Sequence, residues 1–205
     1  METTDYVQDS VVELLFGAAS SWNLADVHAV ASILVLAMDE SVTSGKPLSE
    51  SLGLDAPVLS SFLAKWFPDV PLERFGDLGS DELAVSYEEE CLRKLLFRFS
   101  TGGSALETLL SRILARRSLR SNHLWQDLGL SSRDELSDLM KRHFAPLAAR
   151  NAQNMKWKKF LFRMICLDDQ AGLCPAPTCG ECTEFEGCFG DEAGISLLAR
   201  NGTIH

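Results

Sequence analysis

The chain has 205 residues and a net charge of −10, with 19 Lys and Arg against 29 Asp and Glu. A hydrophobic fraction of 46% excludes a wholly disordered chain and is sufficient for one sizeable core. The acidity argues against a protein that coats nucleic acid or an anionic membrane, because such binding neutralises phosphates with Lys and Arg.

No segment is predicted to cross a membrane. The longest apolar run, residues 27–38, is well short of the roughly 20 residues that span a bilayer. Residues 1–5 are acidic, whereas a secretory signal begins with basic residues and continues with apolar ones. We therefore expect a cytoplasmic protein without a membrane partner, whose six cysteines are reduced.

Residues 1–166 are predicted to form one all-α domain, a bundle-like array of several helices. Asp55 is expected to cap a helix, and Ser80, which precedes two acids, has the pattern of another helix start. The first three helices are expected at about residues 7–19, 25–38 and 57–66.

Later helices show apolar residues at the i, i+3, i+4, i+7 spacing of a buried helix face. Two capping-box pairs mark helix starts, Ser104 with Glu107 and Ser132 with Glu135. Cys91 flanks the first apolar stripe and is expected to be a buried apolar residue. The two stripes are Leu92, Leu95, Leu96 and Phe99, then Leu106, Leu109, Leu110 and Ile113.

Two histidines have different surroundings in the sequence. His143 continues an apolar stripe, which favours a core or helix-end position. His123 precedes Asp127 by four residues, a spacing that would allow the carboxylate to orient the imidazole ring. His123 is therefore a candidate metal ligand, and its alternative role is a helix-start histidine that packs near Trp125.

A basic helix is predicted just before the cysteine-rich end of the chain. Residues 150–166 contain five bases and no acid. Cys166 lies at the edge of the basic face and is either an additional metal ligand or an ordinary helix-end cysteine. The apolar face has Trp157, Phe160, Leu161 and Met164, and the basic face has Lys156, Lys159 and Arg163. The basic face is either a solvated surface or a site that binds an oxyanion.

Residues 167–205 are predicted to be an irregular, cysteine-rich segment that follows the helical domain. Seven acids, one base and recurrent Gly and Pro leave it too little apolar surface to fold alone. Its cysteines have the spacing C-x4-C-x2-C-x5-C, and four thiolates within fifteen residues can surround one metal centre. The four are Cys174, Cys179, Cys182 and Cys188.

The spacing favours an iron–sulfur cluster over zinc. Structural zinc sites usually pair two C-x2-C knuckles, whereas this motif has one such pair between longer steps. A set of redox disulfides is the alternative to metal binding.

Several stretches of the sequence resemble the NifQ family of nitrogen fixation. They are residues 122–130 (NHLWQDLGL), 144–151 (FAPLAARN), 155–160 (MKWKKF) and the cysteine motif through Gly190. The resemblance implies a molybdenum carrier, not an enzyme, that holds an iron–sulfur cluster of the 4Fe-4S or Mo-Fe-S type on the four motif cysteines. It further implies donation of molybdenum to the assembly of the nitrogenase iron–molybdenum cofactor, with the assembly scaffold, its reductase and molybdate as partners.

Two other classes of protein share parts of this pattern. A helical DNA glycosylase with a C-terminal iron–sulfur loop has a similar order of parts, but this chain lacks the glycine-rich hairpin and the basic surface for DNA. A helical interaction module stabilised by zinc or by an iron–sulfur cluster, without metal transfer, is the alternative that remains open.

Overall fold

The computed structural model describes residues 3–19, 21–168 and 185–199, and this part of the chain contains helices and no strand. The all-α prediction is therefore confirmed. In chain order the elements are α1 (Thr3–Gly17), α2 (Leu24–Ser44), α3 (Leu48–Leu52), α4 (Ala56–Trp66), the 3-10 helix η1 (Leu72–Phe75), α5 (Tyr87–Arg98), α6 (Ala105–Ser118), α7 (Leu124–Asp127), α8 (Arg133–His143), α9 (Ala145–Arg150), α10 (Trp157–Asp168) and α11 (Phe185–Phe189).

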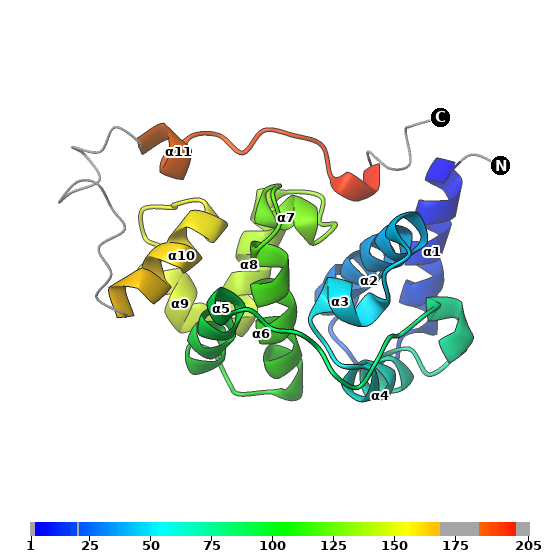
Figure 1. The fold of residues 1–205 in the computed structure, drawn as a ribbon. Coiled ribbons are helices and arrows are strands. Elements are labelled where there is room, and N and C mark those ends of the chain that lie inside the picture. The colour runs from blue at the N-terminus through cyan, green and yellow to red at the C-terminus, as the bar shows by residue number, and fades with distance from the viewer. Residues whose placement is uncertain (1–2, 20, 169–184, 200–205) are drawn as a thin grey trace.

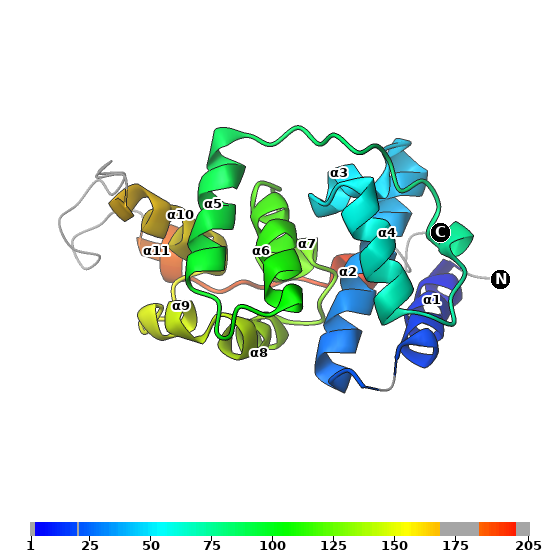
Figure 2. The ribbon, with the colours of Figure 1, turned by 90° about the horizontal axis from the view of Figure 1, so that it is seen from below.

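The helices form two neighbouring groups. Figure 1 shows α1 to α4 at one end of the molecule and α5 to α10 at the other, and in Figure 2 an extended segment after η1 links the two groups. Residues 185–199, hereafter the strap, run along one side from α10 past α7 toward α1 and α2 (Figure 1). Buried leucines and aromatic side chains from both groups belong to one continuous core.

Local signals account well for several helix ends. Ser104 and Glu107 form the predicted capping box, and Asp55 accepts a hydrogen bond from the amide of Val58 at the start of α4. The second helix continues to Ser44, beyond the predicted end, and stops at Gly45, whose φ of 69° suits glycine.

The helix start predicted at Ser80 is wrong. The residues around it are extended, and α5 begins later, with Ser86 as its cap. The carbonyls of residues in this segment accept hydrogen bonds from the first amides of α3 and α4, for example Leu48 N–H to Asp77 O at 2.9 Å and Ala56 N–H to Ser80 O at 3.0 Å. These helix-start amides have no partner within their own helix, so the extended segment satisfies them.

One helix, α2, has the length and composition that a membrane span would need, among the helices that the structure describes. Its apolar side chains, including Ile33, Leu34 and Leu36, are buried within the protein. Burial in the core therefore explains the composition of α2.

A buried ion pair joins the two groups of helices. Arg117 on α6 is fully buried and donates from Nη1 to both carboxylate oxygens of Glu40 on α2, at 2.7 and 2.8 Å. Arg120 donates to the same carboxylate at 2.7 Å. Burial lowers the pKa of Arg117, and the charge of Glu40 opposes this change. The polar end of α2 is thus held by contacts across the fold.

Replacing Asp55 with asparagine is expected to reduce the loss of stability that the protein undergoes as the pH falls. The hydrogen bond from Arg112 to Asp55, at 2.7 Å, is the main reason why the pKa of this carboxyl lies below its usual value. The resulting stability is present above about pH 4 and is lost as the pH falls through the lowered pKa. Asparagine keeps an oxygen to cap α4 but loses the charge.

Urea unfolding at pH 7 and pH 3 measures this effect. The Asp55→Asn variant should be less stable than the wild type at pH 7, and the difference should shrink at pH 3. An equal difference at both pH values would contradict the assignment of the charge effect to Asp55.

Candidate metal centre

One cysteine of the predicted ligand set, Cys188, lies within the described residues, on α11. Its thiol is free, and the residue is half-buried against the core. The backbone of Cys166 belongs to α10, and its side chain is outside the described part. Cys174, Cys179 and Cys182 also lie outside the described residues, so the ligand set stays a prediction.

The position of Cys188 is set by the start of α10. The amide of Lys156 donates to the carbonyl of Cys188 at 2.8 Å, and Lys156 Nζ donates to the carbonyl of Glu186 at 3.2 Å. At the end of α11, Gly190 N–H donates to Glu186 O, and a Cβ on Gly190 would lie 2.6 Å from that oxygen. The close approach requires glycine after the cysteine motif.

The helix that carries the basic residues packs as predicted. Trp157, Phe160 and Leu161 are buried, and the Trp157 indole donates to Ser137 Oγ at 3.1 Å. Trp157 and Phe160 meet edge to face, with ring centroids 5.9 Å apart. The apolar face thereby packs α10 into the core, where α10 lies against α5 and Trp157 bonds to α8.

A buried ion pair that the sequence did not reveal also fixes α10. Lys158 is ion-paired with Asp127 on α7, and its ammonium donates to the carbonyl of Arg120 at 2.7 Å. Burial lowers the pKa of Lys158, while the hydrogen bond to Asp127 raises it. In the sequence Lys158 falls outside the basic face of Lys156, Lys159 and Arg163, but nothing local indicates that it pairs with Asp127.

His123 has a different partner from the one predicted. Asp127 accepts from Asn122 at 3.0 Å and pairs with Lys158, whereas His123 Nδ1 lies 3.4 Å from the carboxylate of Glu192 in the strap. The prediction that Asp127 orients His123 is therefore wrong. The carboxylate of Asp127 is almost fully buried, and Lys158 supplies the charge that it needs there.

The second histidine lies where the stripe predicts. His143 is buried in the last turn of α8, and its Nε2 lies 2.9 Å from Asp26 on α2. It is a core histidine at a helix end.

The predicted oxyanion residues differ in their surroundings. Lys156 is half-buried and bonded to α11, while Lys159 is exposed. Arg163 is half-buried and has interaction partners of its own. Anion binding by these three residues stays a prediction.

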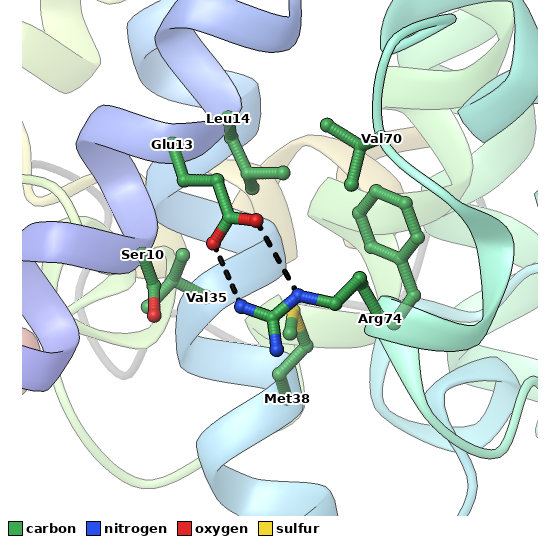
Figure 3. A pocket seen from close by; sticks show the side chains of 8 residues that line it. Ser10, Glu13, Leu14, Val35, Met38, Val70 and Arg74 are labelled. Carbon is green, nitrogen blue, oxygen red and sulfur yellow. Dashed lines mark hydrogen bonds and ion pairs between the residues drawn. The ribbon is translucent and has the colours of Figure 1, made fainter.

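Two hollows in the described part of the chain lie away from the predicted site residues. One groove is lined by aromatic residues of the N-terminal half, including the stacked rings of Trp22 and Trp66. Another hollow lies between α1, α2 and η1, where Arg74 binds Glu13 through two hydrogen bonds (Figure 3). Neither hollow contains a residue of the cysteine motif or the basic helix.

No group of three or more His, Cys, Asp or Glu suited to a metal ion occurs within the described residues. The chemistry of the full donor set nevertheless fits an iron–sulfur centre, since thiolates are its usual ligands. Cys188 is consistent with that set because its thiol is free and its hydrogen bond with Lys156 is made by the carbonyl.

Comparison of the sequence with known proteins shows the family to which it is similar. A sequence model of NifQ matches residues 29–190, from α2 through the cysteine motif. The chain belongs to the NifQ family. The match to the family model ends two residues before Glu192. Residues 191–199 of the strap therefore lie beyond the part of the chain that the family model matches.

Curated relatives carry the same family name. A NifQ homolog of Sinorhizobium fredii is 38% identical over 171 residues, covering 83% of this chain and 74% of the relative. NifQ of Rhodobacter capsulatus is 36% identical, covering 79% and 88%, and NifQ of Azotobacter vinelandii is 36% identical, covering 69% and 78%. No solved structure matches the chain.

Proposed function

We propose that this protein is an iron–sulfur protein that carries molybdenum and donates it to assembly of the nitrogenase iron–molybdenum cofactor. The observation that carries the proposal is the cysteine motif of a NifQ-family chain, in which Cys188 has a free thiol and is bonded through its carbonyl to the start of the basic helix. The protein acts as a carrier and not as an enzyme.

The cargo is held by soft ligands. Thiolates of the four motif cysteines bind iron, and the same donor type suits molybdenum in a sulfur-bridged cluster. His123 and Cys166 are candidates for further coordination. Donation exchanges the bonds from these thiolates to the cluster for bonds to ligands of the acceptor.

The surrounding charge supports the capture of an anionic cargo. Lys156, Lys159 and Arg163 lie on the helix that adjoins Cys188, and their positive charges attract molybdate and balance a thiolate-bound cluster. The partners in this proposal are molybdate, the cofactor assembly scaffold and its reductase, in the cytoplasm.

Metal analysis of the protein purified without oxygen tests the proposal. Iron, acid-labile sulfide and molybdenum should be present together, with the brown absorbance and paramagnetic signals of an iron–sulfur cluster. Zinc alone, in a colourless protein, would overturn the proposal and favour a zinc-stabilised interaction module.

A further inference from the structure

The strap is anchored to the helical body by a carboxylate that is almost removed from solvent. The side chain of Glu192 is only 5% exposed, and its two oxygens face two different groups, an imidazole ring and a guanidinium. Oε1 lies 3.4 Å from His123 Nδ1 at the start of α7, and Oε2 lies 3.6 Å from Arg133 Nε at the start of α8. A carboxylate at this depth requires such partners, because an unpaired buried charge is unfavourable.

Arg133 connects this carboxylate to the turn that precedes α10. Its Nη2 donates to the carbonyl of Asn154 at 2.7 Å and to the side-chain oxygen of Asn154 at 3.1 Å. Asn151 braces the same turn, since its side chain accepts from the amide of Met155 at 2.8 Å and donates to the carbonyl of Met155 at 2.9 Å. The backbone of the turn is thus held rigidly up to Lys156.

These contacts form a closed ring that includes Cys188. From Cys188 the chain leads to Glu192, which pairs with Arg133, which binds Asn154. Two residues after Asn154, the amide of Lys156 donates a hydrogen bond to the carbonyl of Cys188, which closes the ring. A ring of this kind restricts the position of every residue in it, and Glu192 is the member that holds the strap side in place.

We propose that Glu192 is a positioning residue for Cys188. Its ion pairs hold Cys188 at the start of α10. The cysteine is therefore in position before metal binds, and it dissociates slowly from the metal once bound. The effect on metal rests on the function proposed above, whereas the effect on the cysteine does not. Preorganised ligands bind more tightly because less freedom is lost on binding.

The far end of the strap has separate anchors. Gln126 donates to the carbonyl of Ile195 at 2.9 Å, and Leu198 packs against the core. Loss of the Glu192 charge should therefore loosen the segment around Cys188 without detaching the whole strap.

Thiol alkylation of the metal-free, reduced protein tests the proposal. In Glu192→Gln, Cys188 should react about three- to tenfold faster than in the wild type, as expected when loss of the carboxylate charge removes the ion pairing and allows more frequent local opening. Mass spectrometry separates the cysteines, and Cys91, which is also half-buried but lies on α5, serves as the internal control because its rate should not change.

Two further variants make the test specific. Glu186→Gln removes the same charge from an exposed position of the strap and should leave the Cys188 rate unchanged. Arg133→Met should accelerate Cys188, and adding Glu192→Gln to it should have a smaller effect than Glu192→Gln has in the wild type, because the two residues share one ion pair while the contact with His123 is separate. Glu192→Asp keeps the charge and should restore part of the protection.

The loaded protein provides a second measurement. Iron should pass to a chelator severalfold faster from Glu192→Gln than from the wild type. If the wild type binds no iron or molybdenum, the proposed function fails while the alkylation result still decides the role of Glu192. An unchanged Cys188 rate in folded Glu192→Gln overturns the positioning role, even if the wild type carries its metal.

Discussion

Replacing Cys188 with alanine is expected to reduce retained iron and molybdenum at least about tenfold. Groups that only support a metal ligand cost 10- to 100-fold in affinity when they are lost, so a ligand should cost no less. Alanine keeps the backbone carbonyl that accepts from Lys156 and removes only the sulfur. The measurement is the ratio of metal to protein after anaerobic purification, together with the absorbance of the cluster.

Cys91→Ala is the matched control. Cys91 is also a free, half-buried thiol, but it lies on α5 and outside the cysteine motif. This variant should retain the metal content of the wild type. Full metal content in Cys188→Ala, with loss in Cys91→Ala, would refute the ligand assignment.

Replacing Glu40 with alanine is expected to destabilise the fold by about 3–5 kcal/mol, the usual effect of leaving one partner of a buried ion pair alone. The guanidinium of Arg117 is fully buried and has no other carboxylate bonded to it among the described residues. Arg120, which shares Glu40, would repel it. Urea unfolding followed by circular dichroism measures the change from the shift in midpoint.

Two comparisons separate this effect from a general loss of charge. Glu50→Ala removes an exposed partner of Lys46 and should change the stability by no more than about 1 kcal/mol. Adding Arg117→Met to Glu40→Ala should restore most of the lost stability, because an apolar side chain can occupy the buried position without a partner. A midpoint in Glu40→Ala equal to that of Glu50→Ala would show that the buried pair contributes little.

The helices were predictable where the signals are local. A capping box needs only residues three apart, and an apolar stripe needs only one helix, so α6 and the buried face of α10 followed directly from the sequence. The error at Ser80 arose because the carbonyls of its segment accept hydrogen bonds from the first amides of distant helices. The residues next to Ser80 in the sequence give no sign of these partners.

The candidate site was predictable in part. The four motif cysteines lie within fifteen residues of one another, and the basic helix that precedes them is also visible in the sequence. Glu192 was missed because its partners, His123 and Arg133, are 69 and 59 residues away and its own neighbourhood in the sequence is acidic. Lys158 and Asp127 were missed as a pair, and Asp127 was assigned to His123, because the fold alone brings α10 beside α7.

The sequence by itself determined the helical class, the family and the four candidate thiolates, since periodicity, capping and short motifs depend on residues close together in the chain. Only the tertiary structure decided which charges are buried and which residues hold Cys188 in place. The reason is physical: the energy of a charge depends on its exposure to water and on its partners, and folding alone sets both.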